Sequence, residues 1–257
     1  MKGVERLTLS VVPGIPLVQP GDDLGVLIIA AMEKAGLAPQ SDDAVVVAQK
    51  VISKAQGRYV DLAKITPSVR AKQLAVEVGK DPRLVEVILR ESARVVRSSR
   101  DVLIVEHHLG FIVANAGVDR SNVPPSAGTD PVLLLPEDPD GTAEMLREQL
   151  GAHFGVRLGV VINDSFGRPW RRGTVGVALG AAGIPALRNL RGQPDLFGHP
   201  LLVTETALAD ELASAASVLM GQADEGQPVV LISGLPPGED IVPARALIRP
   251  ASEDLFR

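Results

Sequence analysis

The amino-acid sequence predicts a mixed fold of the α/β (α+β) class, because apolar runs of strand length alternate with longer segments of helical periodicity along the whole chain. Several of the short runs are apolar at every position, which is typical of strands buried on both faces of a sheet. The 25 glycines and 20 prolines are dispersed between these runs and mark turns. We expect one unit over residues 1–257, with the Pro- and Gly-rich stretch at residues 123–139 as the candidate internal boundary.

In the first part of the chain, residues 6–12 alternate apolar and polar side chains and predict a strand that ends in a tight turn. Residues 22–35 predict a helix, because two aspartates give it an acidic start and a glycine follows its end. Residues 44–48 form a short buried strand. Helical spacing with charges on the outer face predicts two further helices, over residues 67–79 and 82–97.

The remaining two thirds repeat this mixture. Apolar runs predict strands over residues 101–106, 110–114, 132–135, 156–162, 174–179 and 229–232. Amphipathic spacing predicts helices over residues 142–154 and 206–220.

Composition excludes several classes of protein. With 26 Lys and Arg against 31 Asp and Glu, the net charge is -5, and a general nucleic-acid binder normally has a clustered basic face. The absence of cysteine excludes disulfides, Cys-ligated zinc, iron–sulfur clusters and thiol nucleophiles. The longest apolar run, residues 26–32, is too short to span a bilayer, and residues 1–19 contain no uninterrupted apolar core of the kind that a secretory signal has. We therefore expect a cytoplasmic protein without membrane or nucleic-acid partners.

The common nucleotide-binding signatures do not occur. A P-loop requires G-x-x-x-x-G-K-[ST], but the Gly79-Lys80 pair is followed by Asp81. No G-x-G-x-x-G opens a helix after the first strand, so there is no Rossmann motif either. A nucleotide, if bound, would require a different fold.

Two polar stretches are candidates for chemistry. Asp119, Ser121 and Asn122 follow a run of small residues and offer the hard oxygen ligands that Mg²⁺ or Mn²⁺ prefers, although an Asx-type turn explains this spacing more simply. Asp164 and Ser165 follow an apolar strand, and in open α/β sheets ligands gather at such strand ends.

Basic residues accompany the second stretch. Arg168, Arg171 and Arg172 surround the only tryptophan and could bind an anionic substrate, or they could be solvated residues of a turn. Lys50 and Lys54 are four apart and could meet a polyphosphate, although such pairs are usually solvated. His107 and His108 are expected to be polar loop residues rather than metal ligands.

Taken in order, five stretches resemble the coenzyme F420-0:L-glutamate ligase family, called CofE in archaea and found as the N-terminal domain of FbiB in actinobacteria. They are residues 14–17, 49–58, 114–122, 164–171 and 220–223. The resemblance extends from about residue 11 to residue 234. It implies a two-domain monomer intertwined with its partner in a homodimer.

The resemblance also implies an activity. The family adds L-glutamate to the deazaflavin precursor F420-0, or to its dehydro form, using GTP, and can add a second glutamate through a γ-linkage. GDP and phosphate are released, and analogy with other amide ligases indicates an acyl phosphate. The expected ions are Mg²⁺ or Mn²⁺ at two sites, with K⁺ as a further ion. A ligase for another acidic acceptor and a non-catalytic protein that binds GTP or F420 are the alternatives.

The resemblance assigns roles to individual residues, with Asp119, Asp164 and Lys54 expected to be catalytic. Asp119 and Asp164 correspond to ligands of one metal, and Ser165 and Gln222 to ligands of a second. The three arginines are candidates for the phosphodiester of F420-0 or for glutamate. Expected GTP-binding residues are Gly14, Ile15, Pro16, Leu17, Gln49, Lys54, Asn122, Met220, Gly221, Gln222, Ala223, Asp224, Glu225, Gly226 and Gln227.

Three departures from the family pattern are visible. Relatives can carry Ser at the position of Gln49, and Thr is common at that of Ser165. The nitroreductase-like domain of actinobacterial relatives does not follow residue 257, so we expect only a few glutamates to be added.

Overall fold

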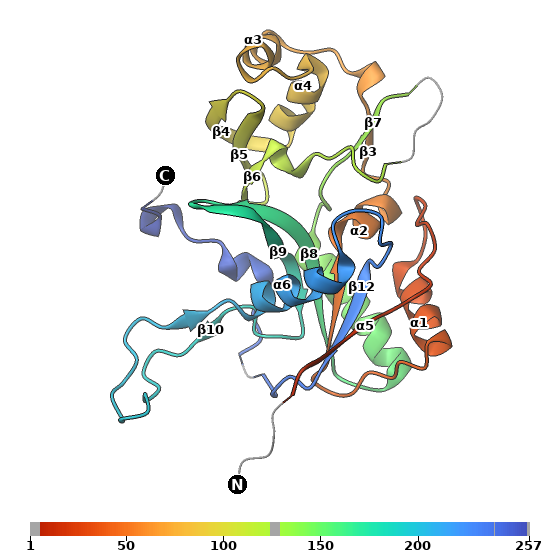
Figure 1. The fold of residues 1–257 in the computed structure, drawn as a ribbon, viewed down its shortest axis with the longest axis vertical. Coiled ribbons are helices and arrows are strands. Elements are labelled where there is room, and N and C mark those ends of the chain that lie inside the picture. The colour runs from red at the N-terminus through yellow and green to blue at the C-terminus, as the bar shows by residue number, and fades with distance from the viewer. Residues whose placement is uncertain (1–5, 124–128, 239, 256–257) are drawn as a thin grey trace.

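A five-stranded sheet forms the centre of the computed structural model, which describes residues 6–123, 129–238 and 240–255 (Figure 1). The strand order is β1 (Thr8–Val11), β12 (Val229–Ser233), β2 (Ala44–Ala48), β8 (Gly159–Arg168) and β9 (Arg171–Ala182). β2 and β8 are parallel, and the other neighbouring strands are antiparallel. This mixed α/β architecture confirms the predicted fold class.

Helices cover both faces of this sheet, because its central strands are apolar on both sides. Val45 and Val47 of β2 face a core shared with α1 (Leu24–Lys34), α2 (Gln49–Ala55) and α5 (Pro139–Phe154). Val46 faces the opposite core, which is closed by α6 (Leu208–Met220) and the short 3₁₀ helix η3 (Ala244–Leu247). A second 3₁₀ turn, η4 (Ala251–Glu253), follows.

The chain leaves this sheet after α2 and builds a third core before it returns. β3 (Tyr59–Asp61) and β7 (Pro131–Leu133) pair antiparallel at the two crossings. Between them lie η1 (Leu62–Lys64), α3 (Val69–Val78), α4 (Pro82–Arg90), β4 (Ser92–Ser99), β5 (Val102–His107), β6 (Ile112–Ala114) and η2 (Asn115–Gly117), drawn at the top of Figure 1. Their apolar side chains form a cluster of their own. Residues 124–128, part of the candidate boundary, lie outside the described residues.

Two predictions of element boundaries are wrong. The helix predicted over residues 82–97 ends at Arg90, because residues 92–99 pair with β5 as strand β4. The strand predicted to end at Ile162 continues to Arg168, because the hairpin with β9 supplies backbone partners beyond the sheet. Asp164 and Ser165 therefore lie within a strand and not at its end. His107, expected in a loop, is the buried last residue of β5.

An extended arm leaves the sheet between β10 (Arg188–Asn189) and β11 (Glu205–Thr206) (Figure 1). Its large apolar side chains are exposed to solvent, namely Leu196, Phe197, Leu202 and Val203. Among the helices of the described residues, none combines the length and the hydropathy that a bilayer crossing requires.

Candidate functional site

The register of the central sheet gathers the predicted site segments at one edge. Val12 N–H donates to the carbonyl of Val229 (2.9 Å), and Ala48 N–H donates to that of Pro228 (2.8 Å). Ala48 is also the parallel partner of Asn163. The turn at residues 14–17, the start of α2, the end of the loop at residues 220–227 and Asp164 therefore lie along the same edge of the sheet.

Asp119 is the first of two carboxylates in this region. Its carboxylate lies 2.7 Å from Lys50 Nζ and accepts hydrogen bonds from the backbone N–H (2.8 Å) and hydroxyl (2.7 Å) of Ser121. Two backbone hydrogen bonds with Leu133 hold the residue in place. Burial alone would raise the pKa of Asp119, but the hydrogen bonds from Lys50 and Ser121 outweigh it and lower the pKa.

Asp164 is the second carboxylate, and it forms no ion pair with another of the described residues. Its burial raises its pKa to about 6, while the positive charge of Lys50 opposes this shift and the negative charge of Asp119 adds to it. Asp119, Asp164 and Lys50 therefore interact electrostatically, although they come from three separate segments. Two carboxylates near one another favour binding of a cation between them.

Lys54 lies one helical turn after Lys50, on the same face of α2. Burial and the neighbouring charge of Lys50 both lower the pKa of Lys54. Two ammonium groups that repel each other at the edge of a sheet would be stabilised by an anion such as a phosphate.

The loop at residues 220–227 joins this site from the end of α6. The Ser165 hydroxyl donates to the side-chain oxygen of Gln222 (2.7 Å), and the Asn122 amide donates to the carbonyl of Ala223 (3.4 Å). Glu225 folds back and accepts the Ala223 N–H (2.8 Å). The loop thereby contacts both of the polar stretches that the sequence singled out.

The oxygen donors of this region fit a hard divalent cation. Ser165 Oγ and Gln222 Oε1 are 2.7 Å apart, close to the ~2.9 Å between adjacent ligands of an octahedral Mg²⁺. No group of three or more His, Cys, Asp or Glu that could hold a metal occurs in the described ranges. Water and phosphate oxygens would have to complete the coordination, as is usual for Mg²⁺.

The structure also shows where Gln49 and the three predicted arginines lie. The Gln49 side chain is buried and donates to Ser53 (2.7 Å) and to the Leu134 carbonyl (3.4 Å), so its amide N–H groups are already used. The arginines lie at the far end of the β8–β9 hairpin, where Arg168 donates to the carbonyl of Arg172 (3.3 Å).

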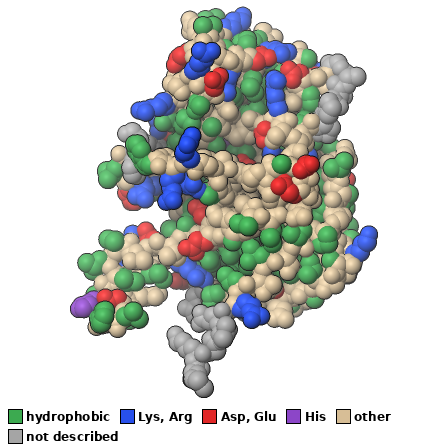
Figure 2. Space-filling view, in the orientation of Figure 1, with side chains coloured by type: hydrophobic (Ala, Val, Ile, Leu, Met, Phe, Trp, Pro, Cys, Tyr) green, Lys and Arg blue, Asp and Glu red, His purple; other side chains and the backbone are tan. Residues whose placement is uncertain are grey.

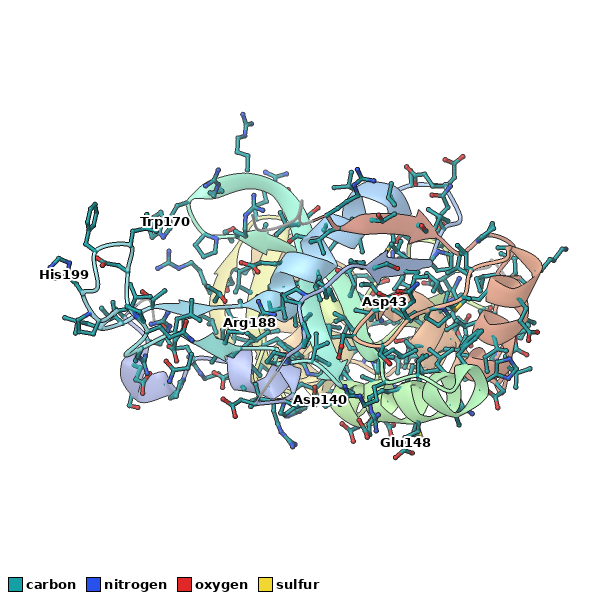
Figure 3. The ribbon with its side chains drawn as sticks, turned by 90° about the horizontal axis from the view of Figure 1, so that it is seen from below. Asp43, Asp140, Glu148, Trp170, Arg188 and His199 are labelled. Atoms are coloured by element: carbon teal, nitrogen blue, oxygen red, sulfur yellow. The ribbon has the colours of Figure 1, made fainter. Side chains whose placement is uncertain are left out.

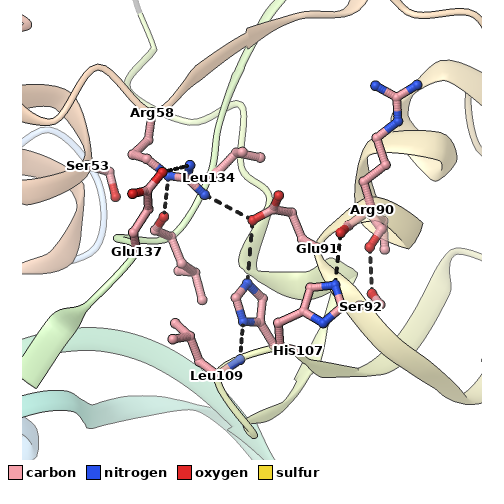
Figure 4. Close-up of polar contacts among 12 residues, drawn as sticks. Ser53, Arg58, Arg90, Glu91, Ser92, His107, Leu109, Leu134 and Glu137 are labelled. Atoms are coloured by element: carbon pink, nitrogen blue, oxygen red, sulfur yellow. Dashed lines mark hydrogen bonds and ion pairs between the residues drawn. The ribbon is translucent and has the colours of Figure 1, made fainter.

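The structure also contains a polar network around Arg58 that the sequence did not indicate (Figure 4). Arg58 donates to the Leu135 carbonyl (3.0 Å), to Glu137 (2.7 Å) and to Glu91 (3.1 Å), and His107 Nε2 lies 3.7 Å from Glu91. The network connects the end of α4 and β5 with the segments that follow α2 and precede α5. Its members are up to 79 positions apart, so no local pattern could indicate it.

The site consists of two carboxylates, two lysines and a polar loop at one edge of the central sheet, a set of groups typical of an enzyme that binds cations and anions. Comparison with known sequences identifies the enzyme class as a ligase. Residues 14–234 match the model of the F420-0:Gamma-glutamyl ligase family. The chain therefore belongs to this family.

Individual relatives agree with this assignment. The coenzyme F420:L-glutamate ligase of Methanopyrus kandleri is 48% identical over 261 residues, covering 100% of both chains. The enzyme of the same name from Methanothermobacter thermautotrophicus is 44% identical over 98% of this chain and 99% of its own. That of Methanocaldococcus jannaschii is 46% identical over 85% and 86%.

Proposed function

We propose that this protein is a GTP-dependent ligase that joins L-glutamate to coenzyme F420-0 through an amide bond and releases GDP and phosphate in the cytoplasm. The observation that carries the proposal is the convergence of Asp119, Asp164, Lys50 and Lys54 at one sheet edge, in a chain whose relatives bear the name F420:L-glutamate ligase.

The chemistry requires activation of a carboxylate, because an oxyanion is a poor leaving group. Transfer of the γ-phosphoryl group from GTP to the F420-0 carboxylate gives an acyl phosphate and GDP. The glutamate amine then attacks the carbonyl carbon, the carbon–oxygen bond to phosphate breaks, and the amine loses its proton. A second glutamate could be joined by the same steps, since the product presents a γ-carboxylate.

Different residues would perform the separate parts of this reaction. Lys54, with Lys50 beside it, would bind phosphate oxygens. The turn at residues 14–17, Asn122 and the loop at residues 220–227 would hold the nucleotide, and the Gln49 side chain would contribute through its remaining oxygen. Arg168, Arg171 and Arg172 would bind the anionic acceptor or glutamate.

The proposed metal ligands are Asp119 and Asp164 for one ion and Ser165 and Gln222 for the other, with K⁺ as a further ion. When bound, Mg²⁺ or Mn²⁺ would neutralise charge on the β- and γ-phosphates during transfer. Without the ion, Lys50 compensates Asp119. Asp164 forms no ion pair within the part of the chain that the structure describes, and it is the residue whose charge a cation would favour most.

We also propose a homodimer, supported by the exposed apolar side chains of the arm, Leu196, Phe197, Leu202 and Val203. Monomeric proteins rarely expose such a group of large apolar side chains in one segment. A second copy of the chain would remove them from water.

The test is to incubate the protein with F420-0, L-glutamate, GTP and Mn²⁺ and to measure products by mass spectrometry. One or two added glutamyl units, absent without GTP, would support the proposal. GTP hydrolysis without a glutamylated product would indicate a different acidic acceptor. GTP binding without turnover would indicate a non-catalytic binding protein, and the dehydro form tested in parallel would show which precursor is preferred.

A further inference from the structure

The tip of the β8–β9 hairpin carries the chain's only tryptophan in an exposed position. Trp170 is 90% exposed and projects from the hairpin, away from the body of the protein (Figure 3). A bare indole in water gains nothing for the fold, since none of its apolar surface is removed from solvent. Tryptophan and arginine are enriched among the residues that contribute most to binding energy at interfaces.

The backbone at this position is also unfavourable. Trp170 has φ +64°, in the left-handed region that glycine or asparagine usually occupies in a tight turn. The turn therefore carries a strain of about 1 kcal/mol for a residue with a Cβ. Local stability therefore explains neither the bulky side chain nor its exposure.

Three arginines lie within two residues of this indole along the chain. Arg168 and Arg171 are paired across the hairpin, and Arg172 follows. None of the three takes part in an ion pair in the described part of the chain, and the Nε of Arg168 is buried without a hydrogen-bond partner there. Figure 2 shows Lys and Arg side chains gathered at the left edge of the molecule, at the level of the hairpin. The tip therefore combines an uncompensated positive charge with a flat aromatic surface.

The same strand joins this tip to the proposed reaction site. Asp164 and Ser165 precede Arg168 on β8, and Ser165 and Trp170 are five residues apart, at most about 17 Å along an extended strand. The order along the hairpin is thus the carboxylate and hydroxyl groups, then the arginines, then the indole.

We propose that the hairpin tip is the acceptor-binding element, with Trp170 stacked on the planar deazaflavin ring and the arginines bound to the phosphodiester. This inference rests on the proposed function and adds the residue that recognises the ring. F420-0 presents its groups in the matching order, because its ring, phosphodiester and reacting carboxylate follow one another along the molecule. Arginine binds phosphate through two parallel N–H donors, and aromatic rings stack on an indole in an offset arrangement.

Because the protein has one tryptophan, emission excited at the long-wavelength edge, where tyrosine does not absorb, reports on Trp170 alone. We expect F420-0 to quench this emission with a saturation curve that coincides with binding measured by calorimetry. The matched control combines Trp170→Phe with Val76→Trp, which moves the single indole to the exposed face of α3. Its emission should fall only by the fraction of light that F420-0 absorbs, and this loss is the correction applied to the wild-type curve.

Steady-state kinetics provide the second readout. Trp170→Ala should raise the KM for F420-0 by about 5- to 100-fold, the range expected for loss of one aromatic stacking contact. The KM for GTP should be unchanged, and Trp170→Phe should restore most of the affinity for F420-0. Val76→Ala, which removes an exposed apolar side chain from α3, is the control and should change neither constant.

The outcomes separate this inference from the proposed function. Calorimetric binding of F420-0 without quenching, or an unchanged KM for F420-0 in Trp170→Ala, would overturn the role of the tip and leave the ligase intact. If the emission of the protein is already blue-shifted without F420-0 and F420-0 does not quench it, Trp170 lies in a subunit interface. This result would overturn the role of the tip as well. If F420-0 neither binds nor reacts, the proposed function fails and this inference fails with it.

Discussion

The two aspartates of the site differ in how the protein compensates their charge, and this difference can be tested residue by residue. Asp119 has Lys50 as its partner, whereas burial leaves Asp164 with a pKa of about 6. Asp164→Asn keeps the shape but removes the charge. We expect at least about 100-fold loss of kcat, since even a residue that only supports a metal ligand costs 10- to 100-fold. Mn²⁺ should raise the Tm of the wild type but not that of this variant.

Glu148→Gln on the exposed face of α5 is the control for charge removal and should retain both activity and the Tm shift with Mn²⁺. Turnover of Asp164→Asn at the wild-type rate would contradict its assignment as a metal ligand.

Glu91 predicts a pH dependence of stability. Its contact with His107 and the charge of Arg58 lower the pKa of Glu91 against the opposing effect of burial. A carboxylate whose pKa is lowered by folding stabilises the protein above its unfolded pKa, and this contribution is lost as the pH falls through the lower folded value. Glu91→Gln should therefore reduce the free energy of unfolding by about 1–3 kcal/mol at pH 7, and by less below pH ~4.

Urea unfolding of the wild type and Glu91→Gln at pH 7 and pH 3.5 measures this difference. An equal loss of stability at both pH values would show that packing, and not the charge of Glu91, stabilises the Arg58 network.

At the scale of elements, strand β9 is contacted closely by a helix on each face, and two glycines make this approach feasible. A Cβ at Gly180 would lie 2.4 Å from the backbone of Pro139 in α5, and one at Gly176 would lie 2.3 Å from the carbonyl of Ala213 in α6. Backbone cannot move aside as a side chain can. Gly180→Ala should therefore lower the free energy of unfolding by about 1–3 kcal/mol.

Gly167 lies on the same hairpin with open space around its Cα, so Gly167→Ala is the matched control and should be nearly neutral. Thermal unfolding of the two variants makes the comparison. If Gly180→Ala were as stable as Gly167→Ala, α5 could shift away from β9 at little cost.

The same scale shows what a sequence can and cannot predict. The start of α1 was predictable because its signal is local: Asp23 accepts the N–H of Val26 (3.1 Å) within one turn. The end of α4 was not, because β4 becomes a strand only by pairing with β5. Likewise, Asp119 stood out as a polar residue after small ones, but its ion pair with Lys50 joins positions 69 apart, a contact that only the tertiary fold creates.

At the scale of the whole molecule, the arm between β10 and β11 exposes its large apolar side chains, which the fold of one chain does not explain. Its tip side chains Leu196 and Phe197 are 99% and 86% exposed. Hydrogen bonds within the arm, such as Leu201 N–H to the carbonyl of Gln193 (2.8 Å), give it a defined shape although no core supports it. A preformed apolar segment of this kind favours association with a second copy, because little ordering entropy is lost on binding.

We therefore expect light scattering to give about twice the chain mass of 27.0 kDa for the wild type. Leu196→Ser combined with Phe197→Ser should shift the mass towards that of one chain, because each apolar side chain withdrawn from water at an interface contributes roughly 1.5–3 kcal/mol. Val218→Ser, which changes an exposed side chain of α6, should leave the wild-type mass unchanged. A wild-type monomer would show that the arm meets a different partner, and a dimer that survives both arm substitutions would place the subunit interface elsewhere on the protein.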